Sequence, residues 1–142
     1  LSFFKNKLGM LVKILYGKDV IISPHEGALK TILPNLSGNL ISKALKAAKI
    51  LNTIVVLKGA TTIIASPKNK ALVNPAGAKW LATAGSGDVL AGIIGGLLSN
   101  KMDTFYAAAY AVWLHSEAGK HLGPGLVAED IPKILPEILK II

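Results

Sequence analysis

Apolar positions in the first half of the chain change between a strand-like and a helix-like pattern. Residues 20–23 form a short, mostly apolar run, and residues 53–57 are apolar or β-branched without interruption. An uninterrupted run is typical of a parallel strand that is covered on both faces. Between the two runs, residues 40–51 repeat apolar side chains at helical spacing. This order predicts a strand, a right-handed crossover helix and a second, parallel strand.

The helix predicted over residues 40–51 is amphipathic, because lysines recur along one side of it and apolar residues along the other. We expect its inward side to consist of Leu40, Ile41, Ala44, Leu45, Ala47, Ala48 and Leu51. The core of the first half of the chain is therefore expected to form where this helix covers the two strands.

Weaker patterns place the remaining elements. They predict helices over residues 1–16, with an interruption at Gly9, and over residues 27–33, 89–98 and 104–121. Alanines along one side of the helix at 104–121 suit close packing against the helix before it. Residues 62–66 and 71–74 flank a polar turn, which predicts a β-hairpin. The last helix is expected to be capped by Glu129 or Asp130 and to kink or restart at Pro136.

The composition narrows the class of protein. The chain has 142 residues, a length that suits one domain, and 51% of them are hydrophobic. It contains no cysteine, which excludes disulfides, thiolate catalysis and thiolate metal sites and fits a cytoplasmic protein. The longest apolar runs are shorter than the roughly 18 residues expected of a membrane span, so no membrane partner is expected.

The chain is strongly basic but contains no arginine. All 16 basic residues are lysines, and 8 acidic residues leave a net charge of +8. Bidentate recognition of phosphates or bases by arginine is therefore impossible. The lysines are scattered, with few aromatic residues among them. This pattern favours a solvated basic surface, then steering of an anionic small ligand, and it does not predict a nucleic-acid partner.

A glycine-rich segment, Gly85-Ser86-Gly87-Asp88, directly precedes the apolar run at 89–98. Glycines at a helix N-terminus allow close approach to the amides there, which attract anions. Asp88 would then lie beside the bound anion, as a phosphoryl-transfer site requires. The alternative is an ordinary helix N-cap, because serine and aspartate are common at that position. The residues of this segment favour neither interpretation over the other.

Two further segments follow predicted strands. Lys58, in the segment Lys58-Gly59-Ala60-Thr61-Thr62, is either a phosphate ligand or a strand-terminal lysine that extends to solvent, and the segment does not match the P-loop motif. His25 follows the first strand, at the end where ligands collect in α/β sheets. It could donate a hydrogen bond to a ligand, but the residues alone favour a histidine that caps the next helix.

Two other histidines, His115 and His121, fall on or at the end of the helix predicted at 104–121. They are six residues apart and therefore do not form the His-x-x-x-His pair of a zinc site, and no acidic residue lies at metal-ligand spacing. We expect packing or surface roles for them and predict no metal ligand in the chain.

Several motifs occur in a fixed order along the chain: Ser-Pro-His-Glu-Gly, Val-Leu-Lys-Gly-Ala-Thr-Thr, Asn-Pro-Ala-Gly, Ala-Gly-Ser-Gly-Asp-Val-Leu-Ala-Gly and Ala-Val-Trp-Leu-His. Together they resemble the ADP/ATP-dependent NAD(P)H-hydrate dehydratases, the YjeF C-terminal-domain family of the ribokinase-like superfamily. The resemblance implies a three-layer α/β fold with a mainly parallel sheet flanked by helices. It implies that residues 1–142 are a single domain, the C-terminal part of such a dehydratase domain whose N-terminal portion is missing.

The resemblance also implies an activity. Members of the family repair the S-form of hydrated NADH or NADPH: ADP or ATP, with Mg²⁺, phosphorylates the added hydroxyl, and loss of phosphate restores the reduced nicotinamide. Asp88 matches the catalytic aspartate, which also contacts the substrate, and His25 matches a substrate-contacting histidine. Gly85, Ser86 and Gly87 match the anion hole. Nucleotide contacts are implied for Lys58, Gly59, Ala60, Thr61, Thr62 and Gly87.

The chain departs from the family pattern in two respects. The family sequence Thr-Pro-His-Pro-Gly-Glu becomes Ser-Pro-His-Glu-Gly-Ala here, so Glu26 replaces a proline and Ala28 replaces a carboxylate. Family domains also carry roughly a hundred or more further residues before Val20, a length near the range of a complete α/β domain. We therefore expect a homo-oligomer or association with the missing half. An inactive nucleotide-binding remnant and a ribokinase-like small-molecule kinase remain the alternative functions.

Overall fold

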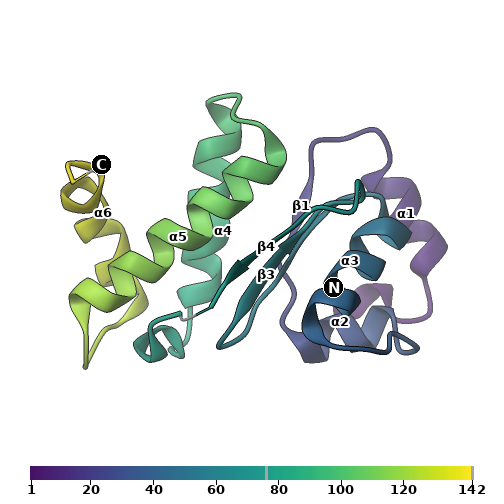
Figure 1. Ribbon diagram of the computed structural model, residues 1–142, viewed down its shortest axis with the longest axis horizontal. Helices are drawn as coiled ribbons and strands as arrows, with labels where there is room; N and C mark the ends of the chain where they lie inside the picture. The colour runs from purple at the N-terminus through teal and green to yellow at the C-terminus, as the bar shows by residue number, and fades with distance from the viewer. Residues whose placement is uncertain (76, 142) are drawn as a thin grey trace. The chain divides into compact units, whose positions relative to one another are not determined.

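The computed structural model describes residues 1–75 and 77–141 and divides the chain into two compact units, residues 1–73 and 74–142. Each unit has its own buried apolar cluster. Figure 1 labels the helices and strands of both. No helix in the described part of the chain is long and apolar enough to cross a membrane.

The first unit is a small mixed sheet with helices. Its elements are the 3-10 helix η1 (Ser2–Phe4), α1 (Leu8–Leu15), β1 (Ile21–Ile22), α2 (Glu26–Ile32), α3 (Leu40–Leu51), β2 (Ile54–Leu57), β3 (Thr62–Ala65) and β4 (Ala71–Asn74). The strands are ordered β1-β2-β3-β4 in the sheet. Gly9 lies inside α1, so it does not interrupt that helix; the interruption comes earlier, between η1 and α1.

The first two strands are parallel, as the crossover pattern predicts. Ile21 lies opposite Ile54, and Ile22 lies opposite Val55. β2 and β3 are antiparallel, with Val56 opposite Ile64. The sheet in the described residues is therefore mixed rather than mainly parallel. The reason is the short turn between β2 and β3, because a parallel connection needs a crossover of a dozen residues or more.

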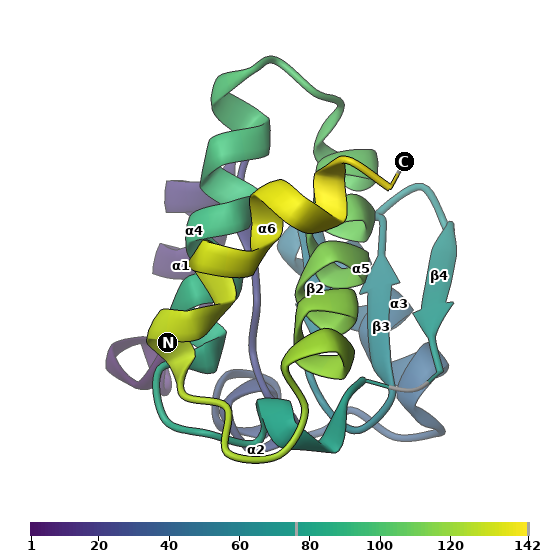
Figure 2. The same cartoon turned by 90° about the vertical axis from the view of Figure 1, so that its left-hand side faces the viewer.

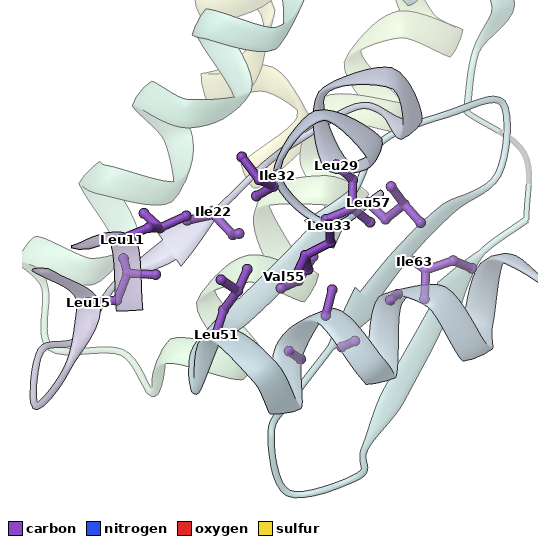
Figure 3. Close-up of a cluster of buried hydrophobic side chains, with 14 residues drawn as sticks. Leu11, Leu15, Ile22, Leu29, Ile32, Leu33, Leu51, Val55, Leu57 and Ile63 are labelled. Atoms are coloured by element: carbon purple, nitrogen blue, oxygen red, sulfur yellow. The ribbon is translucent and has the colours of Figure 1, made fainter. Parts of the chain in front are cut away.

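The core of this unit forms where three helices meet the strands (Figure 3). Leu29 of α2 and Leu51 of α3 belong to one buried cluster with Val55 of β2, and Leu11 of α1 joins it beside Ile22 of β1. Along α3, the buried positions are Ala44, Ala47, Ala48 and Leu51, all at 0% exposure. The small alanines let the helix backbone approach the strands closely.

The prediction that Ile41 faces inward is wrong, because this side chain is 40% exposed. On a helical period, Ile41 lies at the margin of the stripe formed by Ala44, Ala48 and Leu51. It also belongs to the first turn of α3, which begins at Leu40 after the Asn39 cap.

The second unit is helical. It contains the 3-10 helix η2 (Lys79–Leu81), α4 (Ser86–Ser99), α5 (Thr104–Leu122), the 3-10 helix η3 (Ala128–Asp130) and α6 (Ile131–Leu139). α5 lies against both α4 and α6 (Figures 1 and 2). It buries Ala107, Ala108, Ala111 and Ala118 completely. The contact between the alanine-lined helix and its predecessor confirms the sequence prediction.

The ends of these helices follow local rules. Asp103 caps α5, and its carboxylate accepts hydrogen bonds from the amides of Phe105 and Tyr106. α6 continues through Pro136 to Leu139 without a restart. Pro136 has no amide hydrogen, so the carbonyl of Pro132, four residues earlier, lacks its helical donor. Pro132 is exposed, so water can replace that donor. Proline is therefore tolerated at this position.

We predict that Leu51→Ala lowers the free energy of unfolding by about 2–5 kcal/mol, because it opens a cavity at a fully buried position. The matched control is Ile50→Ala, one position earlier on the same helix, where the side chain is 44% exposed and the expected loss is about 0.5 kcal/mol. Urea unfolding followed by circular dichroism measures both. Equal losses would contradict the placement of α3.

Candidate functional site

In the first unit, two segments singled out by the sequence meet at the carboxyl ends of β1 and β2. The amide of Lys58 donates a hydrogen bond of 2.8 Å to the carbonyl of Pro24. His25 and Lys58 form a parallel β-bridge beyond the ends of the two strands. The backbone ladder therefore places these two residues side by side, at the edge of the sheet where ligands of α/β proteins collect.

His25 is the N-cap of α2, as the residues alone suggested. Its Nδ1 accepts a hydrogen bond of 3.2 Å from the amide of Ala28, and the side chain is exposed. A ring nitrogen that accepts carries no proton, so the proton of the neutral imidazole lies on Nε2. The cap therefore uses one nitrogen and leaves the other as a donor. The capping role and a ligand-contacting role are compatible.

Glu26, which stands where the family has proline, forms an ion pair with Lys43 of α3. The hydrogen bond from Lys43 and its charge lower the pKa of the Glu26 carboxyl. This pair ties the start of α2 to α3. Since both side chains are partly exposed, its contribution to stability is small.

The segment from Lys58 to Thr62 is the turn that connects β2 and β3. Thr62 is buried, and its hydroxyl donates to the Gly59 carbonyl at 3.3 Å and lies 3.5 Å from the Gly59 amide. Gly59 leaves little room for a side chain, since a Cβ there would lie 3.2 Å from the Thr61 carbonyl oxygen. Lys58 and Thr61 are half-buried and Ala60 is exposed. Thr62 thus holds the turn, and the nucleotide contacts of this segment stay a prediction.

In the second unit, the glycine-rich segment opens α4. Gly85 is the N-cap with φ of +82°, in the left-handed region that favours glycine. Its carbonyl accepts hydrogen bonds from the amides of Asp88 and Val89 at 3.0 and 3.1 Å. Ser86, Gly87 and Asp88 form the first turn, where the amides before Asp88 lack acceptors within the helix. The side chain of Asp88 is exposed beside this turn.

Gly85 is also backed by the segment before α6. A Cβ at Gly85 would lie 3.2 Å from the Cβ of Ala128, the first residue of η3. The carboxylate of Asp130 accepts a 3.3 Å hydrogen bond from the Val127 amide, which closes this 3-10 turn. Asp130 occupies the expected N-cap position of α6, but its side chain caps η3 instead.

The side chain of Ser86 is buried and directed at α5. Its Oγ lies 3.0 Å from Nε2 of His115, which is itself buried. His115 is a packing histidine, as expected, but its contact with the glycine-rich turn was not predicted. The two residues are 29 positions apart, so only the packing of α5 on α4 reveals the pair. His121 is exposed near the end of α5, as expected.

No group of three or more His, Cys, Asp or Glu side chains that could hold a metal ion occurs within residues 1–75 and 77–141. Of the predicted site residues, the structure brings together His25 and Lys58 in the first unit. It brings together Gly85, Ser86, Gly87 and Asp88 in the second. That both groups contact one ligand stays a prediction.

The fold, a sheet flanked by helices, matches ribokinase-like α/β proteins. A ribokinase-like superfamily protein from Enterococcus faecalis matches with a TM-score of 0.77 at 25% identity, over 95% of this chain and 50% of that one. Residues 10–138 match the family described as NAD(P)H-hydrate dehydratase. The chain belongs to this family.

Individual relatives agree with the assignment. The ADP-dependent (S)-NAD(P)H-hydrate dehydratase of Neisseria meningitidis is 43% identical over 80% of this chain and 42% of its own length. That of Bacillus subtilis is 35% identical, over 93% of this chain and 52% of its own length.

A crystal structure of the ADP/ATP-dependent enzyme from Bacillus subtilis, co-crystallised with ATP/Mg²⁺, matches with a TM-score of 0.78 at 33% identity. The match covers 85% of this chain and 47% of that one. The chain thus spans about half the length of these relatives. A bifunctional NAD(P)H-hydrate repair enzyme from Moorella thermoacetica is 33% identical over 95% of this chain, which covers 28% of that longer protein.

We predict that Gly85→Ala destabilises the second unit by about 1–2 kcal/mol, because alanine disfavours the left-handed conformation and its Cβ would press on Ala128. Gly92→Ala is the matched control, in the same helix. A Cβ there meets nothing within 4 Å, so we expect a gain of about 0.5–1 kcal/mol. Thermal unfolding measures both, and a gain at Gly85 would contradict the turn geometry.

We also predict a pH-dependent contribution from Asp130. Hydrogen bonds from Lys133 and from the Val127 amide lower the pKa of its carboxyl below the ordinary value of 3.8. A lowered pKa in the folded state stabilises the protein above pH 3.8, and this stabilisation is lost as the pH falls through the folded pKa. Wild type should therefore exceed Asp130→Asn in stability at about pH 6, and the gap should close in acid. Urea unfolding at several pH values measures it, and a gap that widens in acid would refute this.

Proposed function

We propose that this chain carries the nucleotide-dependent dehydratase site of its family, which acts on the S-form of hydrated NADH or NADPH with ADP or ATP. The observation that carries the proposal is the left-handed Gly85 turn that opens α4, with the exposed Asp88 in its first turn. Family membership and relatives named ADP-dependent (S)-NAD(P)H-hydrate dehydratase support it.

The residues present fit a phosphate chain. The amides at the start of α4 and the positive end of the helix dipole favour an anion beside Gly85, Ser86 and Gly87. In this proposal Lys58 contributes a positive charge to nucleotide binding, as a lysine point charge commonly does at phosphates. The turn from Gly59 to Thr62 lines the nucleoside, and the Nε2–H of His25 donates to the substrate.

Asp88 supplies the proton transfer. Its carboxylate takes the proton of the hydroxyl that was added to the nicotinamide ring, while the hydroxyl oxygen attacks the terminal phosphorus and the bond to the leaving nucleotide breaks. The amides of the turn stabilise the charge on the phosphoryl oxygens. Loss of phosphate, together with a ring proton, then breaks the carbon–oxygen bond and restores the double bond of the reduced nicotinamide.

Magnesium enters this scheme with the nucleotide. A Mg²⁺ ion typically keeps several waters and is held largely by substrate phosphates in such sites. The related Bacillus subtilis enzyme was likewise co-crystallised with ATP and Mg²⁺ together.

The proposal includes a partner for the site. Since the chain spans about half the length of its relatives, the remaining substrate contacts would come from the other half of the domain, in a longer chain or as a separate polypeptide. A homo-oligomer is the other arrangement that we consider. The chain has no cysteine, which suits a reaction in the cytoplasm.

The testing experiment follows the absorbance of reduced nicotinamide after purified hydrate is mixed with ADP or ATP and Mg²⁺. The chain is assayed alone and with the segment of the Bacillus subtilis enzyme that it does not match. Nucleotide-dependent recovery supports the proposal. A stable phosphorylated product would indicate a small-molecule kinase, and nucleotide binding without turnover in either format would indicate an inactive remnant.

In the format that is active, we predict that Asp88→Asn lowers kcat by about 10²–10⁴-fold, because the amide cannot take the hydroxyl proton. The matched control is Asp19→Asn, an exposed carboxyl in the loop before β1 of the first unit. It should leave kcat and the melting temperature unchanged. Unchanged turnover in Asp88→Asn would refute the role of Asp88.

A further inference from the structure

A buried polar contact in the second unit joins α5 to the start of α4. Nε2 of His115 lies 2.9 Å from the carbonyl oxygen of Ser86 and 3.0 Å from its Oγ. The two residues are 8% and 3% exposed, so donor and acceptors are shielded from water. A hydrogen bond in such surroundings holds its partners more firmly than one at the surface, where water competes for them.

The carbonyl contact decides where the proton of His115 lies. A carbonyl oxygen can only accept, so Nε2 must carry a proton and donate it. The Ser86 hydroxyl, which lies near the same Nε2–H, then accepts as well, and its own hydrogen points away from the ring. A histidine in this state cannot take a proton from the serine. The pair is therefore not a nucleophile with its general base, although its spacing would suit one.

The peptide plane links this bond to the proposed phosphate site. The carbonyl of Ser86 and the amide of Gly87 belong to one planar, trans peptide group and point in opposite directions. Holding the carbonyl therefore also sets the direction of the Gly87 amide. That amide lies at the N-terminal end of α4, where the phosphate would bind, and Asp88 is the next residue.

We propose that His115 is a positioning residue for the phosphate-binding turn: its Nε2–H holds the carbonyl of Ser86 and thereby aims the amide of Gly87 and the carboxylate of Asp88. The catalytic consequence of this role rests on the proposed function, whereas the hydrogen bond and its effect on the turn do not. Preorganised donors of this kind cost no reorganisation during the reaction.

The first measurement is the tautomer of His115 in the ¹⁵N NMR spectrum of the intact chain. A protonated Nε2 at neutral pH is the expected result. An unprotonated Nε2 would overturn the proposal, since it could then only accept from the Ser86 hydroxyl. This measurement needs neither nucleotide nor turnover.

The second measurement compares His115→Gln, whose side-chain amide can donate from the position of Nε2, with His115→Phe, which keeps a ring but has no donor. We expect His115→Gln to preserve amide hydrogen exchange at Asp88 and Val89, whose amides donate to the Gly85 carbonyl in this turn. In His115→Phe, exchange at both amides should rise about tenfold, as the loss of one hydrogen bond allows. The exposed His121, changed to Phe, is the control on the same helix and should change neither.

The same variants are titrated with inorganic phosphate and with ADP and Mg²⁺. We expect affinity to fall about three- to tenfold in His115→Phe and to stay near wild type in His115→Gln, the range of one hydrogen bond. Equal behaviour of the two variants would overturn the proposal. If His115→Phe does not fold, loss of protection at the Asp88 and Val89 amides in a folded His115→Gln would overturn the proposal, and retained protection would support it. A wild type that binds neither ligand would refute the proposed function while the exchange data still decide the role of His115.

Discussion

The first unit depends on the parallel backbone ladder between β1 and β2. Its last step is the hydrogen bond from the Lys58 amide to the Pro24 carbonyl, and it places His25 next to Lys58. The ladder is held because α3 covers the strands with alanines and Leu51, which leave little distance between helix and sheet. A short parallel pair of this kind has little stability alone, so the helix that covers it also maintains the candidate site at its end.

The second unit depends on contacts that keep the glycine-containing turn before α4 in one conformation. Gly85 adopts a left-handed φ that side chains disfavour, and Ala128 closes one side of it. His115 holds the other end of the turn through the carbonyl of Ser86. The flexibility of glycine is thus restricted by contacts from two segments far along the chain. Such restriction is what an anion site built from backbone amides requires.

The end of the β1–β2 ladder and the turn at Gly85 are both consistent with the fold and with membership of the family. The relatives are about twice as long as the matched region or longer, and the matched region includes the glycine turn, the lysine turn and the histidine loop of this chain. The replacement of proline by Glu26 and of a carboxylate by Ala28 leaves the His25 cap intact, because the cap uses only the imidazole and the amide of residue 28. The loop therefore keeps its cap, and its carboxylate lies at residue 26 instead of residue 28.

The sequence by itself determined the elements whose signals are local. The period of apolar residues gave the exact bounds of α3, the strand–helix–strand order predicted the parallel pair, and the cap at His25 depends on an amide three residues away. Tertiary structure decided what distant residues do to each other. The exposure of Ile41 and the bond between His115 and Ser86 followed no local pattern. The physical reason is that hydrophobic periodicity indicates which face of a helix is buried, whereas the packing of the next helix or strand decides which polar atom is found there.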